Sequence, residues 1–128
     1  YVGGFSTYRA TPKTWYNAES SGTTYRAKIG LMYVSDYGYA ASNSYWTTTM
    51  SSYDRAKNNN WMYMGLSEWA ISRDSSSSNV ASRVYYTGHL SNYFVYNNRC
   101  AVRPCFYLTS STTYVSGSGT RSDPIRIN

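Results

Sequence analysis

Apolar and aromatic positions in this chain form short runs separated by polar turns, a pattern typical of a small domain with short elements. Residues 1–23 are rich in Gly, Ser and Thr, and we expect an irregular N-terminal segment whose aromatic pair at 15–16 packs inward. The run 24–32 predicts a strand that enters the core through Ile29 and Leu31.

Two short helices are predicted after this strand. Ser35 has the side chain of an N-cap, and Asp36 would place an acidic group in the first turn of a helix that runs to residue 41. In 44–57 large side chains recur at three- to four-residue spacing, which indicates a second helix although Ser and Thr are poor helix formers. The side chains that set this spacing are Trp46, Met50 and Tyr53.

Strand patterns dominate the second half of the chain. Residues 61–66 are an aromatic segment that we expect to be buried, and 69–72 predict a short strand. The runs 80–86 and 90–96 flank a Thr-Gly pair at 87–88, so they predict a β-hairpin.

The last third of the chain alternates apolar and polar residues. The alternation over 101–108 predicts a strand with one apolar face, and 125–127 predict a final strand that lies close to the first one. Helices followed by antiparallel strands make the whole chain, 1–128, a single α+β domain. The apolar face of the 101–108 strand consists of Val102, Phe106 and Leu108.

Composition favours a recognition surface over a catalytic one. The chain has 16 Tyr residues, and Tyr offers large contact area, little rotamer entropy and a hydrogen-bonding tip. The net charge of +6 permits an anionic partner, but the basic residues do not form the stripe that tracking a phosphate backbone requires. This scattering argues against nucleic acid as the partner. The lysines are Lys13, Lys28 and Lys57.

Residues able to perform chemistry are few and scattered. His89 is the only histidine, and Cys100 and Cys105 do not form a ligand-spaced pair with it. No Gly-x-Ser-x-Gly motif occurs, and no two carboxylates are paired for acid–base work. We therefore expect no enzyme activity, no cofactor and no metal site.

Three further features leave alternatives open. Cys100 and Cys105 are either a small buried residue and a partly exposed thiol, or a disulfide that would need a turn between them. Arg103 either contacts an anion or forms a structural ion pair with Asp36 or Glu68. We recognise no signal peptide or membrane span, although an anchor could have been removed.

Five residue types are present in the first part of the chain and absent from the rest. Residues 1–69 contain 13 Lys, Glu, Gln, Met or Trp residues, and 70–128 contain none. An Asn codon that ends in C has adenine at its first two positions. Replacing these adenines by any base gives codons for every residue type except these five. The stretch 75–100 uses only reachable types, as targeted adenine mutagenesis would leave it. Codon or strand bias is the alternative, and the tail after Cys100 lacks the five types too.

Four motifs in this order carry a resemblance to a known family: IGLMYVSDYGYA (29–40), NWMYMGLSEWAISR (60–73), AVRPCFYL (101–108) and GSGTRSDPIRI (117–127). The chain resembles bacterial surface and prepilin-like proteins with a formylglycine-generating-enzyme-type C-type lectin fold. Members look like variable proteins of diversity-generating retroelements, in which adenine-directed mutagenesis rewrites a segment before the last strands. The resemblance covers roughly the last three-quarters of the chain.

The resemblance implies a constant scaffold that displays a rewritten binding face over about 80–100. Core or turn residues in this region would be fixed, namely Ala81, Val84, Gly88, Leu90 and Val95. Ligand-binding, variable positions would be Ser82, Arg83, Tyr85, Tyr86, Thr87, His89, Ser91, Asn92, Tyr93, Phe94, Tyr96, Asn97, Asn98 and Arg99.

The implied function is non-enzymatic binding by an adhesin- or receptor-type domain at a bacterial cell surface or pilus. Its ligand would be a protein or carbohydrate on another cell, a phage or a host. The calcium-binding motifs of C-type lectin sugar sites, such as Glu-Pro-Asn, do not occur, and neither does the pilin membrane helix. A calcium-independent lectin domain with a fixed sugar specificity is the alternative.

Overall fold

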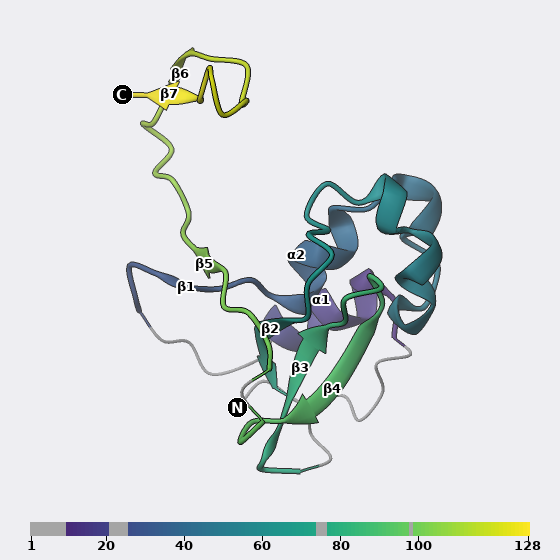
Figure 1. The fold of residues 1–128 in the computed structure, drawn as a ribbon. Helices are drawn as coiled ribbons and strands as arrows, with labels where there is room; N and C mark the ends of the chain where they lie inside the picture. Colours follow the sequence, from purple (N-terminus) through teal and green to yellow (C-terminus); the bar gives the residue numbers. More distant parts are fainter. Residues whose placement is uncertain (1–9, 21–25, 74–76, 98) are drawn as a thin grey trace.

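The computed structural model describes residues 10–20, 26–73, 77–97 and 99–128, and Figure 1 shows how their elements are arranged. The chain is a small α+β protein with few helices and antiparallel sheets, as predicted. The helices are α1 (Pro12–Ser20) and α2 (Val34–Tyr39), followed by the 3₁₀ turns η1 (Asn43–Tyr45), η2 (Met50–Arg55) and η3 (Lys57–Asn59). The strands are β1 (Gly30–Leu31), β2 (Glu68–Arg73), β3 (Val80–Val84), β4 (Leu90–Phe94), β5 (Pro104–Cys105), β6 (Tyr114–Ser116) and β7 (Arg126–Ile127).

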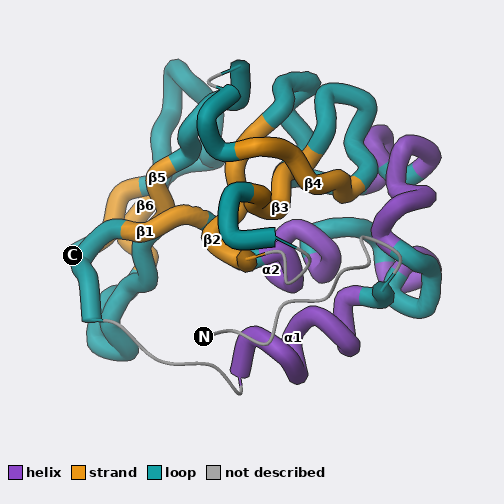
Figure 2. Tube along the Cα trace, turned by 90° about the horizontal axis from the view of Figure 1, so that it is seen from below, coloured by secondary structure: helices purple, strands orange, loops and turns teal. Residues whose placement is uncertain are grey.

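Helix α1 lies inside the segment 1–23, which we predicted to be irregular, so that prediction is wrong for residues 12–20. Thr11 precedes the helix, and its hydroxyl accepts a hydrogen bond from the Thr14 backbone N–H at 3.4 Å. Pro12 occupies the first helical position, where its missing N–H costs nothing. Pro12, Trp15 and Ala18 are buried at helical spacing, and Figure 2 shows α1 along one side of the molecule near α2.

Helical structure forms at both predicted positions, 35–41 and 44–57, but only the first is an α-helix. Helix α2 begins at Val34, so Ser35 lies inside it and is not its N-cap. The second segment forms η1, η2 and η3 instead of one α-helix, in keeping with the poor helix propensity of its Ser and Thr residues. Its Met50 and Tyr53 are fully buried, whereas Trp46 is exposed.

The largest sheet has the strand order β2–β3–β4, and both pairings are antiparallel. It contains the strand predicted at 69–72 and the hairpin predicted at 80–96. The core lies between this sheet and the helical half, where Trp15, Tyr37 and Tyr53 are the largest buried side chains. Aromatic side chains thus fill the space that aliphatic residues occupy in most small domains.

A buried ion pair joins the sheet to the chain that follows the hairpin. Arg103 donates through Nη2 to Oε1 of Glu68 at 2.6 Å and through Nε to Oε2 at 2.7 Å. It also donates to the Met62 carbonyl at 2.6 Å. Glu68 is fully buried, so the alternative of a structural ion pair with Glu68 is confirmed.

Several positions that we predicted to be buried are exposed, because no described element packs over them. The 101–108 strand forms only at β5, which pairs with β1, and Phe106 is 64% exposed. The 61–66 segment buries Met62 and partly buries Tyr63 but leaves its other large side chains exposed, and Ile29 does not enter the core. Exposed residues that we predicted to be buried are Tyr16, Ile29, Trp61, Met64, Leu66, Val102, Phe106 and Leu108.

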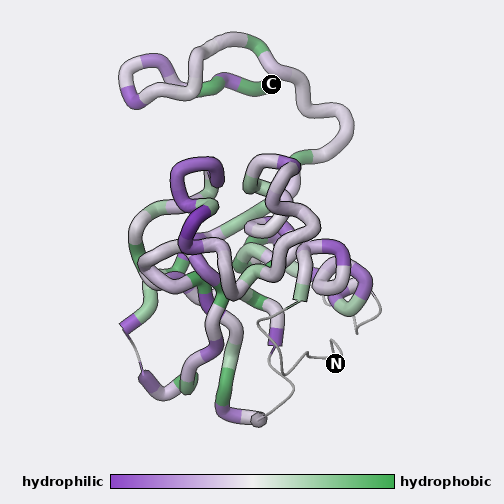
Figure 3. Tube along the Cα trace, turned by 90° about the vertical axis from the view of Figure 1, so that its right-hand side faces the viewer, coloured by the Kyte–Doolittle hydropathy of each residue, from purple (hydrophilic) through white to green (hydrophobic). Residues whose placement is uncertain are grey.

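The final strand does not lie beside the first one. β7 pairs with β6 in a C-terminal hairpin, and β1 pairs with β5. Figure 1 shows this hairpin standing away from the rest of the domain, and Figure 3 shows the same separation from another side, with hydrophobic positions in the hairpin. Ile125 and Ile127 are exposed because nothing among the described residues covers this hairpin.

Glu19 links α1 to α2 and β2 through a partly buried hydrogen-bond network. Its Oε1 accepts bonds from the Ser72 hydroxyl and from the Ser35 backbone N–H. The Ser72 Oγ in turn accepts the Val34 backbone N–H at 2.9 Å. Burial raises the pKa of Glu19 above its usual value, although the bonds from Ser35 and Ser72 oppose that shift.

Removal of one partner of the buried ion pair should be far more costly than removal of an exposed pair. We expect Arg103→Ala to lower the free energy of unfolding by about 3–5 kcal/mol, because Glu68 would remain buried and uncompensated. Arg126→Ala is the control, since Arg126 pairs with Asp123 at 3.6 Å on the exposed hairpin and should cost less than about 1 kcal/mol. Urea melts measure both, and equal costs would contradict this account.

Glu19 should make stability depend on pH in a defined direction. A carboxyl whose folded pKa is raised stabilises the fold below its unfolded pKa and loses that contribution as pH rises through the folded pKa. Glu19→Gln is neutral at every pH and keeps an acceptor oxygen. We therefore expect the unfolding free energy of the natural protein minus that of the variant to fall as pH rises above about 4.5. Urea melts in this range test it, and a difference that rises with pH would refute it.

Candidate binding surface

The β3–β4 hairpin presents most of the predicted variable positions. Its strands pair in register, with Ser82 opposite Asn92 and Val84 opposite Leu90. At the turn, the Tyr85 N–H donates to the His89 carbonyl at 2.8 Å. The register and the turn bond therefore fix the backbone of the hairpin, and with it the direction of each side chain.

Gly88 is required by the shape of the turn. Its φ is +100°, a conformation that side chains disfavour. A Cβ atom here would lie 3.1 Å from the Lys57 Cβ and 3.3 Å from the Tyr53 carbonyl oxygen. Strain and crowding therefore both support the prediction that Gly88 is fixed.

Side chains outside the hairpin hold its turn, and they do so through backbone atoms. The Tyr37 hydroxyl donates to the Gly88 carbonyl at 2.8 Å, and the Tyr63 hydroxyl donates to the Tyr86 carbonyl at 2.7 Å. Ser67 Oγ accepts the Tyr86 N–H at 3.2 Å. Burial, with the nearby charge of Glu68 as a smaller cause, raises the pKa of Tyr37 well above its usual value, so Tyr37 remains a hydrogen-bond donor.

Glu68 lies beside both ends of the segment 85–100. Glu68 pairs with Val84 at the end of β3 and forms a parallel bridge with Ala101. The backbone N–H of Ala101 donates to the Ser67 carbonyl at 2.7 Å, and that of Trp69 donates to the Ala101 carbonyl at 3.0 Å. The chain therefore leaves Glu68 after Val84 and returns to it at Ala101, so one residue borders both ends of the segment 85–100, which includes β4.

Some of the predicted site residues lie on the inward face of the hairpin and others on its outward face. Val84 and Leu90 are buried, as predicted for fixed residues, and Ser82 lies on the same face and is only 2% exposed. Ser82 therefore belongs to the core and cannot contact a ligand, because the pleat turns it inward. Val95, predicted to be fixed in the core, is instead 53% exposed, because it lies just beyond the end of β4.

Arg83 lies between two aromatic rings on the outward face. Its guanidinium carbon is 3.9 Å from the ring centroid of Tyr93 and 4.8 Å from that of Tyr85. Its Nη1 donates to the Cys100 sulfur at 3.8 Å. Arg83 is partly buried and holds the Tyr85 and Tyr93 rings in place. It therefore stabilises the surface more than it offers a group for a ligand to contact.

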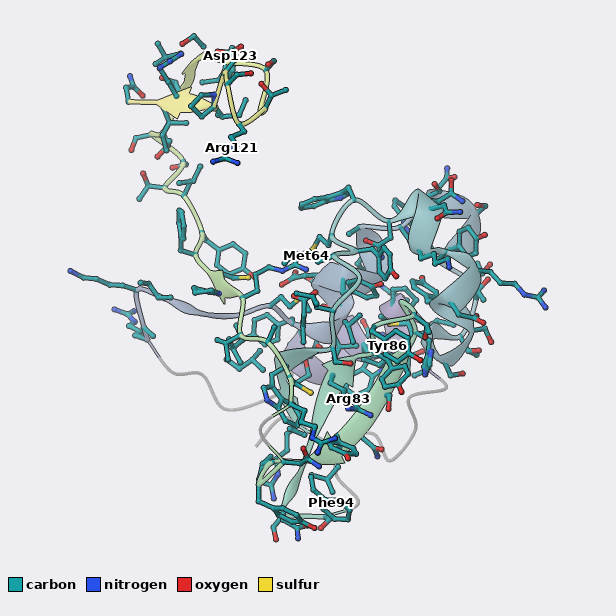
Figure 4. The ribbon with its side chains drawn as sticks, in the orientation of Figure 1. Met64, Arg83, Tyr86, Phe94, Arg121 and Asp123 are labelled. Carbon is teal, nitrogen blue, oxygen red and sulfur yellow. The ribbon has the colours of Figure 1, made fainter. Side chains whose placement is uncertain are left out.

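Aromatic rings continue from this cluster in both directions. Tyr85 contacts Tyr86 at 4.3 Å and His89 at 5.2 Å between ring centroids. At the other end, Phe94 stacks on Tyr96 at 5.1 Å. In Figure 4 the labelled Arg83 lies between Tyr86, near the turn, and Phe94, at the far end of the hairpin.

Most of the predicted positions are at least partly exposed, although the register places Asn92 and Phe94 on the side of the sheet that carries Ser82 and Leu90. Tyr86, Phe94, Tyr96 and Arg99 are exposed, with Tyr96 at 72%, and Asn98 lies outside the described residues. Two polar contacts order smaller members, from Thr87 Oγ1 to His89 Nδ1 and from Asn97 Nδ2 to the Tyr93 hydroxyl, both at 2.8 Å. The partly exposed positions are Arg83, Tyr85, Thr87, His89, Ser91, Asn92, Tyr93 and Asn97.

The shape of this surface suits a broad contact. One shallow hollow of about 320 Å³ borders it, between Ser51 of η2 and residues 89–92 of β4 and the turn. The rest of the aromatic row runs along the hairpin and its flanking turns. Such a surface matches a macromolecular partner better than a small molecule that must be enclosed.

Sequence reasoning missed the side chains that hold the turn. Tyr37, Tyr63 and Ser67 lie 19 to 51 residues before the backbone atoms that they contact. Tyr37 and Tyr63 lie in the motifs 29–40 and 60–73, which carry the family resemblance. That location was the only signal, because nothing in local periodicity pairs a tyrosine with a distant carbonyl.

Other candidate chemistry can be placed as well. Cys100 and Cys105 are free thiols, each partly exposed. Within the described ranges, no three His, Cys, Asp or Glu side chains gather closely enough to hold a metal ion. No helix in the described part of the chain has the length and apolar character needed to cross a membrane.

No protein-family model, curated protein or solved structure matches the chain. The family resemblance read from the sequence therefore stays a hypothesis.

Substitutions should separate the outward face of the hairpin from its core face. We expect Tyr96→Ala and Tyr86→Ala to change the free energy of unfolding by less than about 1 kcal/mol, because both side chains are exposed. Leu90→Ala should cost roughly 2–5 kcal/mol, because Leu90 is fully buried. Phe106→Ala, at an exposed position, should resemble the tyrosines. Denaturant melts decide, and tyrosines as costly as Leu90 would show that they are core residues.

Proposed function

We propose that this chain is a non-enzymatic, hypervariable ligand-binding domain with a C-type lectin-like fold, and that adenine-directed mutagenesis diversifies its hairpin face. Its place would be the surface or a pilus of a bacterial cell, where it acts as an adhesin or receptor. The ligand would be a protein or carbohydrate of another cell, a phage or a host. The surface formed by Arg99 and by the exposed and partly exposed residues among 83–97, here called the hairpin face, would bind it.

The observation that supports this proposal best is how the hairpin is anchored. Tyr37, Tyr63 and Ser67 contact carbonyl and amide groups of the turn, not its side chains. A backbone carbonyl is present whichever residue occupies a position, and an N–H is present for every residue except proline, so these bonds would survive most changes of side chain. A surface held in this way can be rewritten while its geometry is kept.

The closure at Glu68 supports the same conclusion. The segment 85–100 starts and ends beside one buried residue, whose carboxylate is held by Arg103. Neither partner lies within the segment. The ion pair would therefore tolerate change at the exposed positions of the segment, whereas Gly88 and the buried Leu90 would stay fixed.

The side chains of the hairpin face match those of known binding loops. Tyr rings give large, rigid contact area, while Ser, Asn and Arg give adaptable hydrogen bonds. The sequence from 75 to 100 uses only types that adenine replacement in Asn codons can reach, including His89 and Phe94. The mixture serves binding and agrees with the proposed origin.

The gene locus offers a direct test of the mechanism of diversification. We expect a near-identical repeat of the segment that encodes about 80–100, differing from it only at adenines, beside a gene for a reverse transcriptase. A locus without them would favour the alternative of a calcium-independent lectin with fixed specificity.

A display library tests binding and tolerance together. Randomising Tyr85, Tyr86, Phe94 and Tyr96 should leave most members resistant to protease, and selection should yield binders to several unrelated proteins. The control library randomises the inward positions Ser82, Val84 and Leu90, and most of its members should be digested. Equal losses in both libraries, or no binders from the first, would count against the proposed function.

A further inference from the structure

A second hollow lies away from the hairpin face, in the part of the chain that contains no proposed variable position. Its volume is about 460 Å³, within the range of ligand sites. It lies between the residues after α2 and those that follow η3, where Figure 1 shows the chain returning beside α2 towards β2. Its lining is Tyr39, Ala40, Ala41, Ser42 and the run 58–61.

The floor of this hollow is fixed by backbone bonds. Ala41 and Asn60 form an antiparallel bridge, and the Ser42 N–H donates to the Asn59 carbonyl at 2.9 Å. The Asn60 side chain is buried, and it donates to the Tyr37 carbonyl and accepts the Met62 N–H. A preformed floor of this kind lowers the entropy that binding must overcome.

Aromatic rings rise beside this floor. Trp61 is 82% exposed, the highest value among the large apolar side chains of the described residues. Tyr39 is also exposed and meets Trp46 edge-to-face, with 5.3 Å between ring centroids. Tyr39 and Trp61 also line an adjoining apolar hollow of about 380 Å³, so the rings lie along one continuous groove.

Amide groups complete the lining. Asn58 and Asn59 are exposed, and within the described ranges their side chains make no hydrogen bond. An amide donates through its nitrogen and accepts through its oxygen, which matches a hydroxyl group that does both. The residues that line the hollow of 460 Å³ include no Asp, Glu, Lys, Arg or His, so neither an anion nor a cation is favoured there.

Together these features fit one class of ligand. A pyranose ring has an apolar face of C–H groups and an edge of hydroxyls, so it can lie on an aromatic ring while amides bind its edge. We propose that the groove around Trp61 is a fixed binding site for a neutral sugar residue of an oligosaccharide. Trp61 would stack on the sugar, Tyr39 would border it, and Asn58 and Asn59 would bind its hydroxyls.

This site would be independent of the hairpin face. None of the residues that line either hollow lies within 80–100, although residues 105–107, which follow that region, line the hollow of 380 Å³. The domain would then combine a constant sugar contact with a variable contact, so one surface could retain it near glycans while the other selects a partner. Each contact can be removed without the other.

Nuclear magnetic resonance of the tryptophan indole N–H groups offers the test. The probes are neutral trisaccharides of glucose, galactose, mannose or N-acetylglucosamine, added to the ¹⁵N-labelled protein, with Trp61→Phe used to assign the Trp61 signal. We expect at least one probe to shift the Trp61 signal with a Kd of roughly millimolar order, while the buried Trp15 stays unchanged.

Variants then locate the site, with the remaining indole signals as the readout where Trp61 is replaced. Trp61→Ala and Asn59→Ala should each weaken binding at least tenfold without lowering the melting temperature, because both side chains are exposed. Tyr96→Ala, an exposed aromatic on the hairpin face, is the matched control and should bind as the natural protein does.

Three outcomes would overturn the inference. The Trp61 signal could stay unchanged with all four probes. It could shift with protein concentration alone, which would show that a second copy covers the groove. Finally, binding could persist in Trp61→Ala but be lost when Tyr85, Tyr86, Phe94 and Tyr96 are replaced by Ser, which would place the sugar on the hairpin face. Only the last result bears on the proposed function, since it would favour the fixed lectin.

Discussion

The structure depends on one buried charge pair. Glu68 is a carboxylate in the middle of a small protein, and such a group is tolerated only when an opposite charge and good hydrogen-bond geometry replace its water. Arg103 provides both, and its third bond reaches the Met62 carbonyl. The pair thus connects the segment before the sheet, the first strand of the sheet and the chain after the hairpin. The rest of the site is arranged around this junction.

The helical half of the molecule contributes a second kind of constraint. Tyr37 in α2 is buried in the aromatic core, and its hydroxyl reaches the turn of a hairpin 51 residues further along. Its ring packs near that of Tyr53, which in turn donates to the Tyr45 carbonyl. Tyrosine is useful here because one side chain fills space and ends in a donor. The abundance of Tyr therefore reflects two uses, as core with directed hydroxyls and as exposed contact area.

Local signals in the sequence were sufficient for the hairpin but not for its surroundings. The Thr-Gly pair between two alternating runs predicted the turn, and Gly88 adopts the positive φ that such a turn requires. The prediction of an irregular segment over 1–23 did not use Pro12, Trp15 and Ala18, whose spacing is that of the buried face of α1. Element type is thus readable where a turn or cap residue fixes the backbone.

Burial was harder to predict than secondary structure, and the 101–108 segment shows why. Its alternation predicts apolar side chains on one face of a strand, but whether another layer covers them depends on where distant elements pack. The C-terminal hairpin stands apart, so Phe106 is exposed. Ser82 shows the reverse, since a small polar residue gave no sign that the pleat turns it into the core. Candidate site residues could therefore be named as a segment, but their division into two faces needed the register.

Anchoring through backbone groups also limits which sequences the hairpin can accept. The N–H groups of Tyr85 and Tyr86 are donors, to the His89 carbonyl and to Ser67 Oγ, and proline has no N–H to give. Proline is nevertheless among the residues that base changes in an Asn codon can reach. If the proposed diversification operates, folded siblings should be depleted in proline at positions 85 and 86, but not at 96 and 99, whose backbone N–H groups make no such bond among the described residues. The need to fold would then exclude some sibling sequences before binding to any ligand selects among them.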